Sequence, residues 1–178
     1  MSKQRGGVTT THLHTPLGPM LAGATRDGIC LLEFADRPSL PTRLQRVEAA
    51  FGSPPTAGRH PFLDRLATQV SEYFAGTRHG FEIPLVLDGT RFQERIWRGL
   101  LEIPDGRTIS YDELARRAGS PGGSRAAGQA NGENRVAIVV PCHRVIRSNG
   151  DLGGYAGGPG RKHQLLELEG GLPQTRLL

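Results

Sequence analysis

The chain has 178 residues, of which 37% are hydrophobic and 22% charged, and its formal net charge is +5. This length and composition fit a globular protein with one mid-sized domain or two small ones. They exclude a membrane-spanning protein, because no run approaches the roughly 18 apolar residues that a span needs.

The basic charge is concentrated in the second half of the chain. Residues 1–89 hold 9 basic and 8 acidic side chains, whereas residues 90–178 hold 13 and 9. This excess suits an anionic partner such as nucleic acid, although many basic proteins bind none. The N-terminal MSKQRGGVTT lacks the apolar core of a signal peptide, so we expect a cytoplasmic protein whose two cysteines are free thiols.

The N-terminal part of the chain predicts a small antiparallel sheet followed by helices. Residues 9–34 alternate polar and apolar side chains around two turn signals, Pro16-Leu17-Gly18-Pro19 and Arg26-Asp27-Gly28, which predicts a short meander. Thr42–Phe51 is charged and amphipathic, and His60–Phe74 carries its apolar residues at helical spacing. Each of these two segments is therefore expected to form a helix.

Residues 75–89 separate the first set of elements from the second. They open with the helix-stopping Gly76 and contain Pro84, and we interpret them as a strand-like connector between two lobes. The expected domains are residues 1–84 and residues 85–178.

The second lobe begins with two helices whose starts are marked by capping residues. Thr90 can cap a helix with one apolar face, which ends before Pro104-Asp105-Gly106. Ser110-Tyr111-Asp112-Glu113 has the Ser-x-x-Glu form of a capping box. It predicts a helix that runs to Ala118, with Gly119 as its stop.

The segment after Gly119 has an unusual composition. Ser120-Pro121 has the form of a helix N-cap and first position, and GGSRAAGQANG follows, almost wholly of small residues. Each glycine costs about 1 kcal/mol against alanine inside a helix, so stability does not explain them. Small side chains let a helix approach a partner closely, with Arg125 projecting from it. Two short helices here form a helix-turn-helix; the alternative is a glycine-rich loop without function.

A buried strand and a glycine-rich loop precede the final helix. Val136–Val140 is a continuous apolar run, typical of a buried strand, and Pro141 forbids its simple continuation. A turn at residues 148–150, a glycine-rich loop at residues 153–158 and a helix at residues 160–169 complete the lobe.

Cys142 lies where this strand is expected to end, beside His143 and Arg144. Positive neighbours and a hydrogen-bonded imidazole favour the thiolate, which is the nucleophilic form of cysteine. We therefore interpret Cys142 as a reactive cysteine. The alternative is an inert buried thiol, the commonest fate of a cysteine among valines, and we keep that interpretation for Cys30 in GICLLEF.

Residues 90–171 resemble the O6-alkylguanine-DNA alkyltransferases, direct-reversal DNA repair proteins whose signature Pro-Cys-His-Arg-Val stands here at residues 141–145. The N-terminal lobe, with Thr15-Pro16-Leu17-Gly18-Pro19, is similar to the variable N-terminal domain of the bacterial members. Other motifs match in the family's order and spacing: Ile109-Ser110-Tyr111, Ser124-Arg125-Ala126-Ala127-Gly128, Asn134, Gly154-Tyr155 and Leu165-Leu166-Glu167-Leu168-Glu169-Gly170.

The resemblance implies the chemistry of the site. Cys142 would accept the alkyl group, and His143 would act through a water as its general base. Glu169 would orient His143, because a carboxylate fixes the tautomer of an imidazole. Asn134 would tie down the turn around Pro141, where the backbone must bend, since adjacent side chains on a regular strand point apart. An S-alkyl cysteine is a thioether that water does not hydrolyse, so the protein would act once.

The resemblance also implies how the base is reached. An alkylated guanine must rotate out of the duplex before sulfur can attack it. The arginine that matches Arg125 enters the duplex in its place, and the tyrosine that matches Tyr111 assists the rotation. The small residues that bring this helix into the minor groove are Ala126, Ala127 and Gly128.

Four further groups would form the base pocket. Backbone groups of Cys142 and Val145 would read the guanine edge, and Tyr155 with the amide of Ala156 would close the pocket. Several family members have serine where Ala156 stands, so a hydroxyl contribution is absent here. Whether O4-alkylthymine or bulky adducts fit is left open.

The implied fold class is α/β (α+β). It combines a ribonuclease H-like N-terminal supporting domain of residues 1–84 with a mainly helical winged helix-turn-helix domain of residues 85–178. The implied partner is double-stranded DNA with alkylated bases, bound by a monomer, with cooperative assembly on DNA left open. We expect no cofactor and no metal, because Cys30, His12 and His14 lack the spacing of the zinc set that some eukaryotic relatives carry.

Two other functions must be separated from this one. A cysteine hydrolase is disfavoured because its histidine normally comes from a distant segment, whereas Cys142 and His143 are adjacent. A non-catalytic lesion binder of the alkyltransferase-like kind would lack the acceptor cysteine, which is present here. An ester hydrolysis assay and mass spectrometry of the Cys142 peptide distinguish the three.

Overall fold

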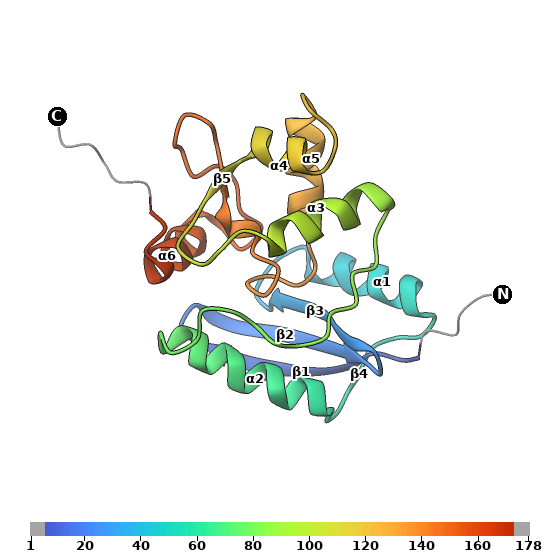
Figure 1. The fold of residues 1–178 in the computed structure, drawn as a ribbon. Coiled ribbons are helices and arrows are strands. Elements are labelled where there is room, and N and C mark those ends of the chain that lie inside the picture. The colour runs from blue at the N-terminus through green and yellow to red at the C-terminus, as the bar shows by residue number, and fades with distance from the viewer. Residues whose placement is uncertain (1–5, 173–178) are drawn as a thin grey trace. The chain divides into compact units, whose positions relative to one another are not determined.

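The computed structural model describes residues 6–172. Within them the backbone forms a four-stranded sheet, a two-stranded sheet and six α-helices, which confirms the predicted mixed α/β class (Figure 1). This part of the chain divides into two compact units. The first runs up to Asp88 and includes Arg135–Ala137, and the second comprises Gly89–Asn134 and the residues from Ile138 onward.

The first unit is built on a sheet of order β3-β2-β1-β4. The strands β1 (Thr9–Thr15), β2 (Gly18–Thr25) and β3 (Gly28–Phe34) form the predicted antiparallel meander. The short β4 (Thr56–Ala57) pairs parallel with β1. The turn signals of the sequence therefore fall where the chain reverses.

Two helices cover this sheet, one on either side of it (Figure 1). Val47 and Phe51 of helix α1 (Leu40–Phe51) belong to one hydrophobic cluster with Val8, Leu21 and Leu31. Leu21 lies in β2 and Leu31 in β3, and Val8 directly precedes β1. Helix α2 (Pro61–Phe74) packs along β1, β2 and β3. Its N-cap is His60, whose Nδ1 accepts the N–H of Phe62 at 3.1 Å.

Two segments from farther along the chain pair with β3. The connector does so at Leu85, where the N–H of Ile29 donates to the carbonyl of Pro84 at 2.8 Å. A Cβ at Gly28 would lie 2.5 Å from that carbonyl oxygen, so the close approach requires glycine. The other segment is Arg135–Ala137, in which Val136 forms a bridge with Leu32.

The predicted strand Val136–Val140 is wrong beyond its first residue. Val136 makes its single bridge, residues 137–139 form a turn and Val140 a bend, with Ile138 at a φ of 71°. All of these side chains are buried, so the apolar run correctly predicted that this segment lies in the core. A continuous apolar run does not distinguish a buried strand from a buried turn, because it carries no periodicity.

The second unit is mainly helical. Its helices are α3 (Arg91–Leu101), α4 (Tyr111–Arg117), α5 (Ser124–Gly132) and α6 (Pro159–Glu169), and β5 (Ile109–Ser110) pairs parallel with β6 (Val145–Ile146). Thr90 caps α3 reciprocally with Gln93, and Ser110 caps α4 through the N–H of Glu113 at 3.1 Å. Both caps stand where the sequence predicts them.

Helix α5 begins later than predicted. Ser120-Pro121 does not start it; the carbonyl of Ser120 accepts the N–H of Gly123 at 2.9 Å and closes a turn in which Gly122 has a φ of 78°. A left-handed residue interrupts a right-handed helix, so α5 starts only at Ser124. Neither α5 nor any other helix of the described residues has the length and apolar character to cross a membrane.

Candidate functional site

Cys142 and His143 lie on a short turn. The residues Cys142–Arg144 form a 3-10 helix, η1, in which the N–H of Cys142 donates to the carbonyl of Val140 at 2.8 Å and that of Arg144 to the carbonyl of Pro141 at 3.0 Å. Cys142 is 5% exposed and His143 is fully buried. A turn frees adjacent side chains from the opposed directions of a strand, so Cys142 and His143 can act on one group.

Two buried asparagines hold carbonyls of this turn. Nδ2 of Asn134 donates to the carbonyl of Val140 at 2.8 Å, and Nδ2 of Asn131 donates to the carbonyl of Cys142 at 3.2 Å. The sequence pointed to Asn134 but not to Asn131. Helical spacing could have revealed it, because Asn131 shares the buried face of α5 with Ala127 and Ala130.

Glu169, near the C-terminus of α6, binds both His143 and Arg144. Its Oε1 lies 2.8 Å from Nε2 of His143, and Arg144 donates to both of its oxygens, from Nε at 3.0 Å and from Nη2 at 2.9 Å. Burial acts to raise the pKa of Glu169, but the hydrogen bonds from His143 and Arg144 outweigh it and lower the pKa to about 2. The charge of Arg144 is therefore directed at Glu169, which stays ionised.

The ionised carboxylate fixes the tautomer of His143. An acceptor-only carboxylate requires the proton on Nε2, which leaves Nδ1 as the basic nitrogen of a neutral ring. Burial lowers the pKa of His143 by more than the Glu169 hydrogen bond raises it, so the ring is neutral near pH 7. Nδ1 is buried and has no hydrogen-bond partner among residues 6–172. It is placed to take a proton.

Lys162 of α6 is a buried cation in the same unit. Its Nζ donates to the carbonyl of Val145 at 2.6 Å and to that of Gly154 at 3.1 Å, and it lies 5.9 Å from the centre of the Tyr111 ring. Burial lowers the pKa of Lys162 to about 8, while negative charge on Cys142 acts to raise it. The sequence analysis missed Lys162, although its spacing of seven residues puts it on the same helix face as Glu169.

The pKa of Tyr111 also depends on the charge of Cys142. Burial raises the pKa of Tyr111, and the charge of Cys142 raises it further, whereas Arg147 acts to lower it. The phenol therefore stays protonated near neutral pH and can donate a hydrogen bond. Both Tyr111 and Lys162 are close enough to Cys142 to sense its charge.

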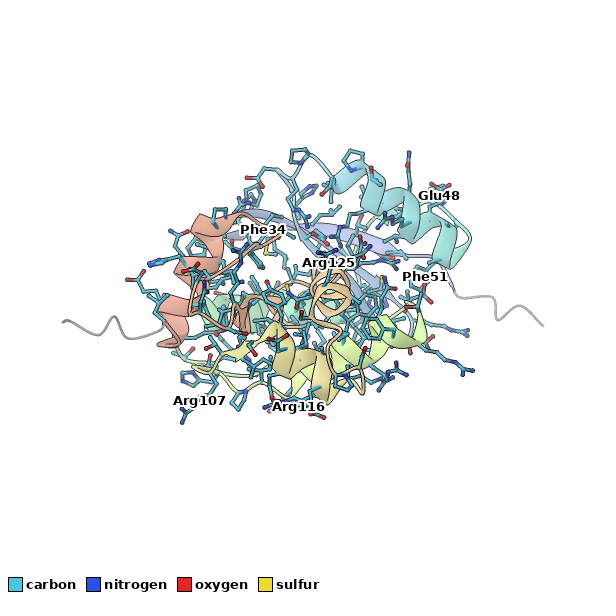
Figure 2. The ribbon with its side chains drawn as sticks, turned by 90° about the horizontal axis from the view of Figure 1, so that it is seen from above. Phe34, Glu48, Phe51, Arg107, Arg116 and Arg125 are labelled. Atoms are coloured by element: carbon cyan, nitrogen blue, oxygen red, sulfur yellow. The ribbon has the colours of Figure 1, made fainter. Side chains whose placement is uncertain are left out.

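Four of the five residues expected at the DNA surface lie on α5, and the fifth, Tyr111, begins α4. Arg125 and Ala126 are exposed, and in Figure 2, where α5 is seen nearly end-on, Arg125 stands at its near end. Ala127 is fully buried. A Cβ at Gly128 would lie 3.5 Å from the Tyr111 ring, which is an ordinary van der Waals contact, so α5 lies against that ring and alanine would also fit here.

Of the residues expected to close the pocket, Tyr155 contacts His143. The ring of Tyr155 meets that of His143 edge-on, with 6.4 Å between the centroids. Ala156 follows it in the glycine-rich loop and is half-buried, and Val145 is fully buried in β6. The structure thus gathers Cys142, His143 and Tyr155 around one turn.

Cys30, in the first unit, has a different environment. It is buried, its Sγ lies 3.6 Å from the carbonyl of Gly23, and burial raises its pKa to about 12. Such a thiol is unreactive at neutral pH. No group of three or more His, Cys, Asp and Glu that could hold a metal ion occurs in the part of the chain that the structure describes.

Comparisons with known proteins point to one family. A model of the DNA-binding domain of 6-O-methylguanine DNA methyltransferase matches residues 91–171. The methylated-DNA–protein-cysteine methyltransferase of Mycobacterium leprae is 44% identical over 160 residues, which cover 88% of this chain and 89% of that protein. The protein of the same name from Methanosarcina acetivorans is 38% identical over 156 residues, which cover 88% and 94%.

Solved structures agree with the sequence comparison. The crystal structure of Mycobacterium tuberculosis O6-methylguanine methyltransferase matches with a TM-score of 0.76 at 38% identity and covers 96% of both chains. That of Mycobacterium tuberculosis OGT in complex with DNA matches with a TM-score of 0.78 at 39% identity and covers 93% of both.

Proposed function

Because this chain belongs to the family of methylated-DNA–protein-cysteine methyltransferases, which repair DNA by alkyl transfer to a cysteine, we propose that Cys142 is the acceptor of the alkyl group. The substrate is O6-alkylguanine in double-stranded DNA. Cys142 and His143 fall within the matched residues 91–171, whereas the other cysteine, Cys30, lies outside them.

One observation carries this proposal: Glu169, held by Arg144, hydrogen-bonds His143 at 2.8 Å and leaves its buried Nδ1 open. Through a bridging water, Nδ1 takes the thiol proton of Cys142, and the thiolate attacks the alkyl carbon. An S–C bond forms, the C–O6 bond breaks, and its electron pair stays on the guanine. Burial keeps His143 neutral, as a base must be.

The transfer is a single event for each protein molecule. The product is a thioether, which has no carbonyl for water to attack. A second thiol could not resolve it, because Cys30 is buried with a pKa raised to about 12. One equivalent of alkylated DNA therefore inactivates one equivalent of protein.

The alkylated nucleotide reaches Cys142 by rotation out of the duplex, at a cost of a few kcal/mol of unstacking. We infer that α5 enters the minor groove, with exposed Arg125 filling the space that the base leaves and with Ala126 against the groove. Ala127 is fully buried and Gly128 lies against the Tyr111 ring, so these two residues face the unit. Tyr111, protonated at neutral pH, donates to the rotated base.

The pocket for that base is built from the turn and the following loop. Carbonyls of Cys142 and Val145 accept from the 2-amino group of guanine. Tyr155 and the N–H of Ala156 close the other side. The edge contact of Tyr155 with the His143 ring, at 6.4 Å, supports a pocket directly over the general base.

The finer fold assignments belong to the same proposal. We infer a ribonuclease H-like N-terminal supporting domain and a winged helix-turn-helix domain in which α4 and α5 are the two helices and the short sheet β5-β6 lies in the wing region. The protein acts as a monomer in the cytoplasm. Cooperative assembly along DNA would bring several bound monomers together.

Transfer stoichiometry tests the function directly. Wild-type protein is incubated with excess duplex carrying one O6-methylguanine, and its peptides are analysed by mass spectrometry. We expect one methyl group per protein, on the Cys142 peptide, and no ester hydrolysis. Sustained turnover would indicate an enzyme of another kind, and binding without modification would indicate a lesion sensor.

A further inference from the structure

Asn131 is a buried amide that contacts the peptide of the acceptor cysteine. It is 6% exposed, and its Nδ2 donates to the carbonyl of Cys142 at 3.2 Å. Its Oδ1 is also buried and has no hydrogen-bond partner among residues 6–172. The side chain therefore uses its donor end on the turn and leaves its acceptor end unsatisfied.

This arrangement is costly if its role is only to fill space. A buried amide oxygen without a partner destabilises the folded state, whereas a leucine has nearly the same shape and no polar atoms. Since the other buried residues of α5 are the alanines Ala127 and Ala130, an apolar side chain here would serve packing better. The amide is therefore kept for the hydrogen bond that it donates to Cys142.

The donor end of Asn131 is held firmly. The indole Nε1 of Trp97, on α3, donates to the carbonyl of Ala130 at 2.9 Å and so fixes the α5 backbone beside Asn131. A carbonyl oxygen has two lone pairs, and Asn131 binds one lone pair of the Cys142 carbonyl from the α5 side. The carbonyl of Val145 is held in the same manner by Lys162 at 2.6 Å.

We propose that Asn131 is a positioning residue for base recognition: it fixes the direction of the Cys142 carbonyl so that the second lone pair meets the 2-amino group of the rotated guanine. This rests on the proposed function, in which that carbonyl reads the base. Asn131 does not touch the alkyl group or the thiol proton. Its contribution should therefore depend on the base having an amino group.

The test compares two lesions in single-turnover transfer. One duplex carries O6-methylguanine and the other O6-methylhypoxanthine, the same methylated purine without the 2-amino group. For wild-type protein the rate with O6-methylguanine divided by the rate with O6-methylhypoxanthine gives the preference for the amino group. In Asn131→Leu we expect this preference to fall by roughly three- to tenfold, the effect of one neutral hydrogen bond.

Asn134 provides the matched control. It is also a buried asparagine that donates to a carbonyl of the turn, but to Val140, which does not meet the base. Asn134→Leu should slow both lesions by the same factor and leave the preference unchanged. A merely structural role for Asn131 would produce that same uniform loss.

The outcomes separate the inference from the function on which it rests. If wild-type protein transfers methyl to Cys142 and Asn131→Leu keeps the wild-type preference, the positioning role is wrong while the function stands. If wild-type protein never modifies Cys142, the function itself is wrong. Should Asn131→Leu fail to fold, Asn131→Met is measured in the same way, and an unchanged preference there overturns the inference equally.

Discussion

Oε1 of Glu169 lies 2.8 Å from Nε2 of His143, which precedes it by 26 residues in the chain. The carboxylate belongs to α6 and the imidazole to the η1 turn, and both lie in the second unit. The geometry of this pair determines which nitrogen of His143 is basic, and in the proposed mechanism that nitrogen takes the proton of Cys142.

Replacing Glu169 by glutamine should slow transfer strongly. The neutral amide no longer fixes the proton on Nε2, and Arg144 loses the charge that it binds. We expect the single-turnover rate to fall by roughly 10²-fold, the low end of general-base contributions. Rapid-quench measurement with O6-methylguanine duplex gives the rate, and DNA affinity measured alongside should be unchanged. A wild-type rate in Glu169→Gln would remove Glu169 from the mechanism.

The transfer rate should be insensitive to pH over a range in which an ordinary histidine titrates. Burial lowers the pKa of His143 below its ordinary 6.5, so the ring stays in its basic form as the pH falls through that value. The rate should therefore remain level from pH 8 to about 6.5 and decline only in more acidic buffer. A midpoint at or above the ordinary value would contradict a neutral, buried base.

Acid should destabilise the fold through the same two groups. His143 and Glu169 both have folded-state pKa values below their ordinary ones, so the unfolded chain binds more protons as the pH falls. For His143, stability is lost as the pH falls below about 6.5. For Glu169 it is lost as the pH falls from 4.5 toward about 2, by on the order of 1–3 kcal/mol. Urea unfolding across this range measures the loss, which Glu169→Gln should reduce in the acidic part.

The two cysteines should differ greatly in reactivity. Iodoacetamide at neutral pH should modify Cys142 and leave Cys30 intact, because burial raises the pKa of Cys30 to about 12. Peptide mass spectrometry over time gives both rates. Lys162→Met should slow modification of Cys142, since its cation and the thiolate stabilise each other. Equal labelling of both cysteines in folded protein would contradict this assignment.

Arg125 should speed alkyl transfer from duplex DNA and have no effect on transfer from the free base. Arg125→Ala removes the side chain that fills the space of the rotated nucleotide, so transfer from duplex should slow by roughly tenfold or more. Transfer from a free O6-alkylguanine base should keep its rate. Arg59→Ala, which removes the same charge from an exposed site in the first unit, is the control. Equal slowing with both substrates would count against insertion into the duplex.

Local signals in the sequence predicted much of the fold. Thr90 and Ser110 placed the starts of α3 and α4, because a cap is a local hydrogen bond that a few residues determine. The start of α5 was misplaced at Ser120, since the left-handed turn at Gly122 leaves no trace in a cap pattern. The strand through Val140 was wrong because burial alone has no period.

The sequence likewise predicted some residues of the candidate site and not others. Cys142, His143 and Glu169 could be named from the signature and its spacing, and the structure brings His143 and Glu169 into contact. Asn131 and Lys162 were not named, because a carbonyl held by a side chain is a tertiary contact, and helical spacing was the one local signal that pointed to them.

The three residues Arg135–Ala137 limit how this protein can be shortened. They belong to the first unit, while the chain on both sides of them belongs to the second. A fragment that begins after Asp88 would lose Leu32, whose N–H donates to the carbonyl of Arg135 and whose carbonyl accepts the N–H of Ala137. It would then present the buried side chains of Val136 and Ala137 to water. A minimal repair module therefore needs either the first unit supplied in trans or polar replacements at these two positions.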